Sequence, residues 1–436
     1  MKNNRYIPLF LIEGYLIFTL LLFQYGPLCF RIHEEKLFWI LIFLYHFAFI
    51  IGYVLQIKVR NEIRAWRPLP IYSFRQRYTL GLLLSFFVWI VYTRSNTKAT
   101  SYIPFDLIEN AMIGIFNPGV RHYWKDSIAA NMQFQSEPLV TACVVLFYFV
   151  YYCLPAFLVL YWKKITYLQK ITSITLIVAN VIVGISVGTN AIIFHELFSL
   201  MGGVMIKRYT EKKDNSGKLF LGIGIFLICC ILYFSYNISN RLNGQEIMFY
   251  KSKSSDITVS SLYTNIHVPP MWLSSLASLE YYICQGYYGM SLALDKEFTP
   301  TFGFGHSFYL IKKFDKTFSS NLFSKTYQAK IDEIWPSARN WHSFYSQMAN
   351  DVGFFGVIMV MFFLGKLVGM VWVDVLFHNN FFAKCLCVLF FPLFIFMPAN
   401  NQLGNMTGTL VAFWEVLFLW LVSRRAGLRI GTFSIW

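Results

Sequence analysis

The sequence predicts an all-α polytopic integral membrane protein, and three observations support this fold class. Hydrophobic residues make up 56% of the 436 residues, whereas charged residues make up only 14%. A soluble globular protein carries roughly a quarter charged residues, so most of this chain faces something other than water. Apolar stretches of bilayer-spanning length recur along the chain. Lys and Arg gather in the short segments between these stretches, as they do in cytoplasmic loops.

Ten apolar stretches can each serve as a membrane-spanning helix. In chain order they are 7–29, 37–57, 78–93, 139–161, 171–188, 190–206, 219–237, 352–373, 382–399 and 408–423. Residues 271–294 are also apolar, but they contain Glu280 and Gln285 and follow two prolines. We therefore expect an amphipathic or re-entrant helix there, at the outer interface. An eleventh span would place the basic C-terminal tail outside, against the positive-inside rule.

The basic residues predict the orientation of the spans. With the N-terminus in the cytoplasm, the short basic segments all fall on the cytoplasmic side: 58–77, 162–170, 207–218 and the C-terminal tail. This clustering explains much of the net charge of +15, so nucleic acid is not an expected partner. Residues 1–436 then form a single membrane domain with two long periplasmic loops, 94–138 and 238–351. No nucleotide-binding glycine motif and no structural disulfide is expected.

Basic and aromatic residues interleave in the two outer loops. Arg121 lies in the first loop, and Arg241 directly follows the seventh predicted span. Arg339 and His342 lie a few residues before the eighth span. Guanidinium groups can bind phosphate oxygens through two hydrogen bonds at once, and aromatic rings are suited to stacking on sugar faces. Together these residues favour a polyanionic glycolipid ligand, whereas each Arg alone could simply contact lipid headgroups.

Ionisable residues also fall inside predicted spans, namely Glu13, His195, Glu196 and Glu415. Such groups are costly in hydrocarbon and are often functional. The adjacent His195 and Glu196 could form a proton relay, but the favoured interpretation is that these groups satisfy one another in the bundle interior. No metal site is expected, because the outer loops contain no cluster of His, Cys or carboxylates with ligand spacing.

A pattern in the second outer loop and in the helix after it carries a family resemblance. It comprises Tyr-Tyr-Ile-Cys-Gln-Gly-Tyr-Tyr-Gly-Met-Ser-Leu-Ala-Leu at 281–294, Gly-Phe-Gly-His-Ser at 303–307, Trp341, and Asn-Asp-Val-Gly-Phe-Phe-Gly at 350–356. This pattern resembles the bacterial O-antigen polymerases, which are the oligosaccharide repeat-unit polymerases of surface-polysaccharide assembly. One position departs from the family: Gly188-Thr189-Asn190 stands where such families often carry an Arg.

The resemblance implies a helical bundle of the GT-C type and a glycosyltransferase that works without a metal or cofactor. The enzyme would lie in the bacterial inner membrane, with its active site facing the periplasm. Its substrate would be an undecaprenyl-diphosphate-linked oligosaccharide. The growing glycan would be transferred, with inversion, to the non-reducing end of another lipid-linked repeat unit, for O-antigen or capsule assembly. A chain-length regulator protein would be a further partner.

Roles for individual residues follow from these expectations. Arg241 and Arg339 would hold the donor diphosphate, with Arg121 as a weaker third, because arginines stabilise the charge of the leaving group. His342 would orient or deprotonate the attacking hydroxyl, and on a helical turn it would share a face with Arg339. The resemblance adds a set of expected substrate-binding residues: His306, Tyr281, Tyr282, Trp341 and Asp351.

Three other functions fit parts of the sequence. An O-antigen ligase would use the same chemistry with lipid A core as the acceptor, and only the resemblance favours a polymerase over it. A lipid-linked oligosaccharide flippase or other transporter would carry charged residues along a central path. The concentration of distinctive residues in one outer loop argues against transport. A membrane acyltransferase would require an embedded catalytic His, for which His195 beside Glu196 is the only hint.

Overall fold

The structure is a computed structural model, and its described residues are mainly helical. It describes residues 2–58, 71–97, 105–117, 119–121, 138–211, seven separate positions between 221 and 236, 257–261, 263 and 270–425. Seven of the described helices are long and apolar enough to cross a membrane. The chain is therefore a multi-pass helical membrane protein, as its composition predicted.

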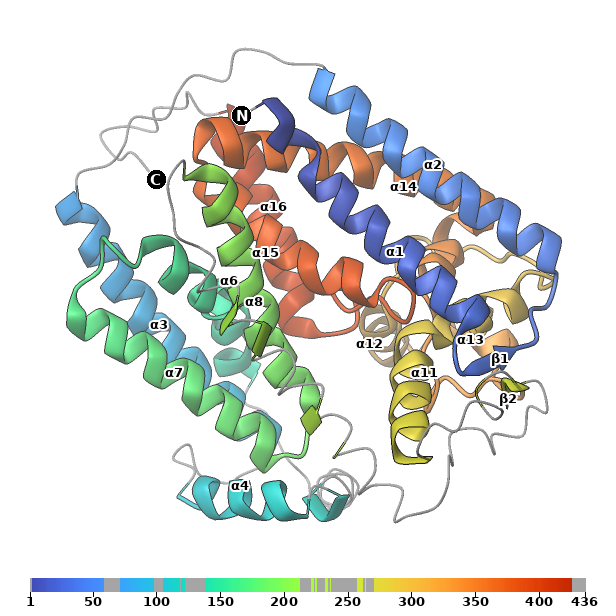
Figure 1. The fold of residues 1–436 in the computed structure, drawn as a ribbon, viewed down its shortest axis with the longest axis horizontal. Helices are drawn as coiled ribbons and strands as arrows, with labels where there is room; N and C mark the ends of the chain where they lie inside the picture. Colours follow the sequence, from blue (N-terminus) through green and yellow to red (C-terminus); the bar gives the residue numbers. More distant parts are fainter. Residues whose placement is uncertain are drawn as a thin grey trace. The chain divides into compact units, whose positions relative to one another are not determined.

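The chain divides into two compact units, of which the first comprises residues 1–62, 245–374 and 392–410. Its membrane-length helices are α1 (Ile7–Tyr25), α2 (Glu35–Lys58) and most of α14 (Phe344–His378) (Figure 1). Its other described elements are η1 (Lys2–Tyr6), β1 (Leu28–Phe30), β2 (Ile257–Val259), α11 (Pro270–Ala293), α12 (Phe308–Phe318), η3 (Phe323–Lys325) and α13 (Tyr327–Lys330).

The second unit comprises residues 63–244, 375–391 and 411–436. It contains four neighbouring helices, α3 (Ile71–Thr97), α6 (Pro138–Tyr161), α7 (Tyr167–Ser186) and α8 (Asn190–Thr210). The short helix α4 (Leu107–Phe116) packs on α7. Most of α15 (Phe381–Phe396) and α16 (Thr407–Arg425) also belongs to this unit.

Seven of the ten predicted spans coincide with a membrane-length helix. These helices are Asn4–Tyr25, Glu35–Ile57, Phe74–Thr97, Val144–Tyr161, Tyr167–Ser186, Phe344–His378 and Thr407–Arg424. The stretches 190–206 and 382–399 are helical as α8 and α15, but neither helix meets the criteria of length and hydropathy for a span. The stretch 219–237 lies mostly outside the described residues.

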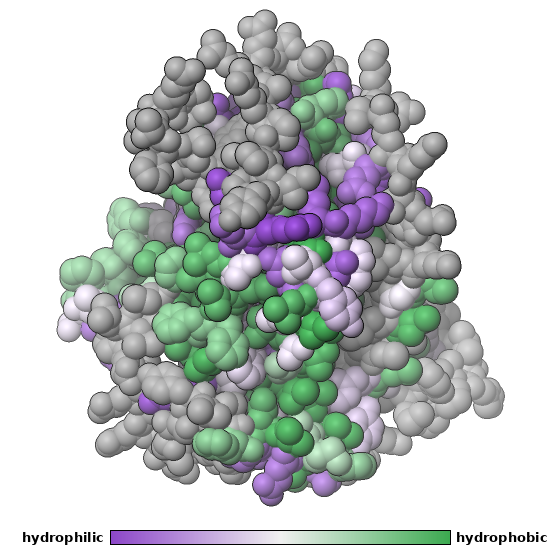
Figure 2. Space-filling view, turned by 90° about the vertical axis from the view of Figure 1, so that its left-hand side faces the viewer, coloured by the Kyte–Doolittle hydropathy of each residue, from purple (hydrophilic) through white to green (hydrophobic). Residues whose placement is uncertain are grey.

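Exposed apolar side chains cover much of the outer surface of the long helices. On α7, Leu168 is 73% exposed and Val178 is 50% exposed, and on α3 Leu83 is 62% exposed. On the face shown in Figure 2, hydrophobic residues form a broad area beneath a row of hydrophilic ones. Soluble monomers rarely expose apolar patches of this extent, whereas a bilayer would solvate them.

The helices α2 and α14 pack closely through glycines in the first unit. A Cβ atom at Gly365 would overlap the backbone oxygen of Phe49, and one at Gly52 would overlap the backbone oxygen of Phe362. Small residues let helix backbones approach in membranes, where van der Waals packing drives helix association. Nearer the start of α14, Gly353 has a φ of 71°, which interrupts the helix where a residue with a side chain would be strained.

The helix expected at 271–294 is present as α11 and begins at Pro270. Nearly its whole circumference is buried between Ala277 and Ala293, which does not fit the amphipathic alternative of the prediction; the re-entrant alternative stays a prediction. The helix packs on α1, and Glu280 accepts a hydrogen bond from the backbone N–H of Leu28 at 2.8 Å. That contact joins α11 to β1, which pairs antiparallel with β2. These two strands and α11 are thereby tied to the end of α1.

Candidate functional site

A cavity of about 170 Å³ lies in the first unit. It is lined by the segment between α11 and α14, by the start of α14 and by the 400–405 loop. Thirteen residues line it: Gly305, Phe308, Ile311, Phe323, Thr326, Gln328, Ser337, Asn340, Trp341, His342, Gln347, Asn400 and Asn405. None of them is Asp, Glu, Lys or Arg. The cavity is smaller than the roughly 300–1,000 Å³ of sites that enclose drug-sized ligands, so it accommodates one small polar group.

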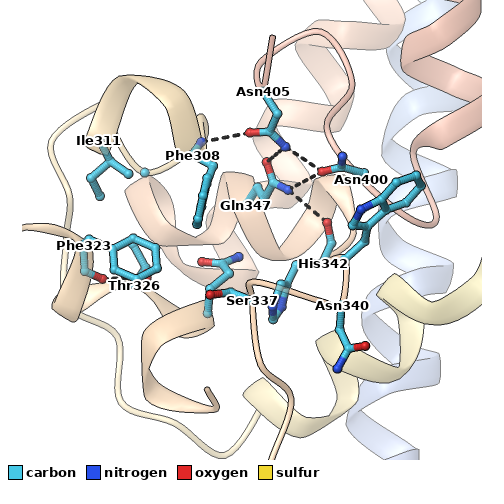
Figure 3. Close-up of a pocket in the computed structure, with 13 residues that line it drawn as sticks. Phe308, Ile311, Phe323, Thr326, Ser337, Asn340, His342, Gln347, Asn400 and Asn405 are labelled. Atoms are coloured by element: carbon cyan, nitrogen blue, oxygen red, sulfur yellow. Dashed lines mark hydrogen bonds between the residues drawn. The ribbon is translucent and has the colours of Figure 1, made fainter. Parts of the chain in front are cut away.

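The wall formed by α12 is positioned by a helix cap. The hydroxyl of Ser307 accepts a hydrogen bond from the backbone N–H of Leu310 at 3.1 Å, which starts the helix at Phe308. The same hydroxyl donates to the backbone oxygen of Gly404. Because Ser307 makes both contacts, the start of α12 is held against the 400–405 loop, and Phe308 and Ile311 face the cavity (Figure 3).

A network of side-chain amides lies beside the start of α12, where Asn405 Oδ1 accepts a hydrogen bond from the backbone N–H of Phe308 at 2.9 Å. Gln347 Nε2 donates to Asn400 Oδ1 at 2.8 Å and to the backbone oxygen of His342 at 3.0 Å. Asn405 Nδ2 donates to the same Asn400 oxygen at 2.6 Å and to Gln347 Oε1 at 3.1 Å (Figure 3). Sequence reasoning missed this network. Its only signal was the polar run Asn400-Asn401-Gln402 to Asn405 between two apolar stretches.

Three buried polar atoms at the cavity have no hydrogen-bond partner: Nδ1 and Nε2 of His342, and Nε2 of Gln328. Each of these two side chains is only 4% exposed. Buried polar groups in native proteins are nearly always paired, and leaving one unpaired costs about 1–3 kcal/mol. The three atoms therefore mark a place where a bound polar group is expected.

Burial lowers the pKa of His342 to about 3, although the carboxylate of Asp332 acts in the opposite direction. The imidazole is therefore neutral at physiological pH and offers one donor and one acceptor. A group with so low a pKa is a weak general base, because proton transfer is most effective when the pKa lies near the working pH. This environment fits orientation of a hydroxyl better than its deprotonation.

Arg339 lies in a turn and is exposed, and the segment from Arg339 to His342 is not helical. The predicted helical face shared by these two residues is therefore wrong. The turn is held instead by Trp335, whose indole N–H donates to the backbone oxygen of Trp341 at 3.1 Å. Because of this turn, His342 faces inward while Arg339 stays at the surface.

Tyr281 and Tyr282 of α11 position lining residues. The hydroxyl of Tyr281 donates to Asn340 Oδ1 at 2.8 Å. The ring of Tyr282 packs on Trp341 with centroids 4.4 Å apart. Of the five substrate-binding residues expected from the resemblance, Trp341 lines the cavity, and the two tyrosines contact residues that line it.

Asp351, on α14, joins that helix to the 301–306 loop, which contains His306 and flanks the cavity. The carboxylate of Asp351 accepts hydrogen bonds from Thr301 Oγ1 at 2.6 Å and from the backbone N–H groups of Gly303, Gly305 and His306 at 2.8–3.0 Å. It also contacts His306 Nδ1 at 3.3 Å. With so many donors on its two oxygens, Asp351 stabilises the 301–306 loop, and neither residue lines the cavity.

The other predicted residues lie elsewhere. Arg121 belongs to the second unit, where its Nε donates to the backbone oxygen of Ser186 at 2.7 Å. Burial lowers the pKa of this guanidinium, with Asp106 acting in the opposite direction. Arg241 lies outside the described residues.

His195 and Glu196 do not satisfy each other, so the favoured interpretation of this pair is wrong. Glu196 accepts a hydrogen bond from Asn180 Nδ2, and the ring of His195 packs edge-on against Tyr152 with centroids 5.5 Å apart. Adjacent residues on a helix point in different directions. His195 Nε2 consequently has no hydrogen-bond partner.

Within the described part of the chain, no group of three His, Cys, Asp or Glu side chains could hold a metal ion. Searches of family models, curated proteins and solved structures found no match to this chain.

Proposed function

We propose that this protein is a membrane glycosyltransferase that polymerises lipid-linked oligosaccharide repeat units at the periplasmic face of the bacterial inner membrane. The growing glycan would pass from undecaprenyl diphosphate to the non-reducing end of a second lipid-linked unit. The observation that carries this proposal is the uncharged cavity in which His342 and Gln328 present unpaired polar atoms. Hydroxyl groups of a sugar can both donate to and accept from such atoms.

The proposed reaction is a direct displacement at the anomeric carbon. The acceptor hydroxyl oxygen forms the new glycosidic bond while the bond from the anomeric carbon to the diphosphate oxygen breaks. The diphosphate leaves with the electron pair, and the hydroxyl proton passes to it or to water. A neutral His342 would accept a hydrogen bond from the hydroxyl and aim its lone pair. Arg339, exposed three residues earlier, would hold the diphosphate together with Arg241.

A transport function is the second candidate, and a different observation favours it. The second unit buries several polar atoms without partners, among them Tyr151 OH, Tyr152 OH and His195 Nε2. A polar interior within a helical bundle is typical of a transport path. Loss of this function would remove all glycan from the cell surface, whereas loss of polymerase activity would leave single repeat units there.

Substitution of His342 and Arg339 tests the polymerase proposal. We expect His342→Ala and Arg339→Lys to reduce the rate by on the order of 10²–10³, because each removes an interaction with the reacting groups. Cells that carry only the variant protein should then display single repeat units instead of a polymer ladder on gel electrophoresis.

The matched controls are His33→Ala and Arg31→Lys, which change the same residue types on an exposed outer segment away from the cavity. Both should give normal ladders. Normal ladders from His342→Ala and Arg339→Lys, at wild-type protein levels, would remove these residues from the mechanism.

A further inference from the structure

A carboxylate without a cationic partner lies inside the second unit. Glu196 of α8 is only 6% exposed, and α8 packs on α6 and α7 (Figure 1). Glu196 accepts a hydrogen bond from the neutral amide of Asn180 on α7. Within the described part of the chain, no Lys, Arg or His side chain forms an ion pair with Glu196. A carboxylate buried in this way requires a proton or a cation, because an isolated charge in an apolar interior is strongly unfavourable.

Neutral oxygen atoms lie around this carboxylate. Asn180 Oδ1 and the hydroxyl groups of Tyr151 and Tyr152 on α6 are buried and have no hydrogen-bond partner. Both hydroxyls lie close enough to Glu196 to interact with its charge. The amide nitrogen of Asn180 is used by Glu196, so the oxygen is the atom of this side chain that stays unpaired. Three helices therefore bring one charged and three neutral oxygen-bearing groups into one region of the interior.

Ring packing holds the two tyrosines in place without using their hydroxyl groups. The ring of Tyr148 lies 5.7 Å from that of Tyr151 and 6.2 Å from that of Tyr152, between ring centroids. The other side of Tyr152 contacts the ring of His195. The hydroxyl oxygens are therefore positioned in advance and remain available to a ligand.

We propose that Glu196, Asn180, Tyr151 and Tyr152 bind one monovalent alkali cation, Na⁺ or K⁺, inside the second unit. Hard cations take oxygen ligands, including neutral ones, and one carboxylate balances a single positive charge. A proton on Glu196 would neutralise the carboxylate but could pair with only one of the neutral oxygens, whereas a cation can contact all of them. This inference is independent of the proposed function, which concerns residues of the first unit.

Thermal unfolding of the full-length protein in nanodiscs tests this inference. Choline chloride is replaced stepwise by NaCl, and in a second series by KCl, at constant ionic strength and pH. An ion that binds only the folded protein multiplies the folding constant about elevenfold when it is present at ten times its Kd. We expect the unfolding temperature to rise with one or both alkali cations. The ion with the lower half-maximal concentration is the better ligand.

Glu196→Gln connects this response to the site. The substitution removes the charge but keeps an oxygen that can accept the hydrogen bond from Asn180, so the half-maximal ion concentration should rise at least about tenfold. Glu13→Gln is the matched control. Glu13 is also a buried carboxylate, but it already contacts His46 Nδ1 at 2.6 Å. This control should keep the wild-type half-maximal concentration.

Tyr152→Phe tests the site with a smaller change, in case Glu196→Gln does not fold. It removes an unpaired hydroxyl and keeps the ring, so in choline chloride the variant should be at least as stable as the wild type. Its half-maximal ion concentration should rise about threefold to tenfold, because one oxygen ligand is lost. Tyr78→Phe is the control, since the Tyr78 hydroxyl is hydrogen-bonded to Ser173 Oγ at 3.0 Å. It should be less stable in every buffer, with an unchanged half-maximal concentration.

An unfolding temperature that is the same in choline, Na⁺ and K⁺ would overturn the inference, because a proton would then be the sole occupant. A wild-type half-maximal concentration in Glu196→Gln would also overturn it, and so would one in Tyr152→Phe. The polymerase proposal is judged separately, because the surface ladder of His342→Ala cells does not measure cation binding.

Discussion

At the scale of single residues, His342 and Asp351 differ in their hydrogen-bond partners, and this difference distinguishes a residue that can bind a ligand from one that stabilises a loop. Both lie in the segment that the sequence analysis singled out, and both are polar side chains with little exposure. The Asp351 carboxylate, on α14, is surrounded by donors from the 301–306 loop. The His342 ring is buried with neither nitrogen paired. Only His342 therefore retains hydrogen-bonding capacity for a ligand.

His342 also predicts how stability depends on pH. Its folded-state pKa of about 3 lies below the ordinary value of about 6.5 in the unfolded chain. Between these two pH values the unfolded chain binds more protons than the folded chain. The contribution of His342 to the free energy of unfolding is therefore complete above pH 6.5 and is lost as the pH falls towards 3. At pH 5 the loss is about 2 kcal/mol. Thermal unfolding in detergent, followed by circular dichroism at pH 7 and pH 5, should show a larger drop for the wild type than for His342→Gln. Equal drops would contradict a buried, neutral imidazole.

At the scale of the elements, glycines decide how closely α2 and α14 approach. Gly52 and Gly365 each lie against the backbone of the other helix. Gly353 breaks α14 near its start, so the residues before the break belong to the cavity and loop region. Hydropathy predicted both helices but carried no information on this close packing.

Gly365→Ala should destabilise the protein, because the new Cβ would overlap the backbone oxygen of Phe49. A backbone atom cannot move aside as a flexible side chain can, and overpacking of this kind typically costs about 1–3 kcal/mol. Thermal unfolding in detergent measures the loss. Gly14→Ala in α1 is the matched control, since a Cβ there would meet nothing within 4 Å. An unchanged unfolding temperature for Gly365→Ala would contradict the close approach of α2 and α14.

The interior between α3, α6, α7 and α8 should hold bound water. Four side chains there bury an unpaired polar atom: Tyr151, Tyr152, Asn180 and His195. Unpaired polar groups are rarely left dry in proteins. Rapid hydroxyl-radical footprinting should therefore modify Tyr151 and Tyr152 despite their burial.

The controls are Tyr45 and Tyr53, which are also buried but donate to the backbone oxygens of Phe354 and Arg5 at 2.7 Å. These two tyrosines should stay unmodified in the same sample. If Tyr151 and Tyr152 stay as unmodified as Tyr45 and Tyr53, the second unit holds no bound water at this cluster.

At the scale of the whole molecule, contacts join segments that the charge pattern assigns to the same side of the membrane. On the predicted outer side, β1 pairs with β2, and Asn401 Nδ2 donates to the backbone oxygen of His306 at 2.8 Å. On the predicted inner side, the indole N–H of Trp372 donates to the backbone oxygen of Asn4 at 2.9 Å. These contacts agree with the predicted grouping of segments on two sides of the membrane, and which side faces the periplasm stays a prediction.

Cys29 provides a direct test of that orientation. It is a free, exposed cysteine on β1, whereas Cys153, Cys284, Cys385 and Cys387 are free and buried. A membrane-impermeant maleimide added from the periplasmic side should label the wild type, and Cys29→Ser should remove that signal. A reporter fused after Arg429 should report cytoplasm. Labelling of Cys29 only after the membrane is permeabilised, so that the reagent reaches the cytoplasmic face, would show that the orientation is the reverse of the predicted one.

The sequence by itself determined the class of protein and the position of most helices. Hydropathy over a stretch of about 20 residues is a local property, and a bilayer imposes a fixed length on every span. The sequence also singled out His342, because it stands in an aromatic and basic segment, and its role stays a prediction. Its burial and its weak basicity were not, since both depend on what packs around it.

Only the tertiary structure decided which distant residues form the site. The amides of Asn400 and Asn405 reach the cavity because the 400–405 loop packs on α12 and on the start of α14. Asp351 became a loop anchor because residues 301–306 fold around it. Hydrogen-bond partners and burial are set by contacts between segments far apart in the chain. Composition and spacing do not encode these contacts locally, and for that reason the residue types were predictable while their roles were not.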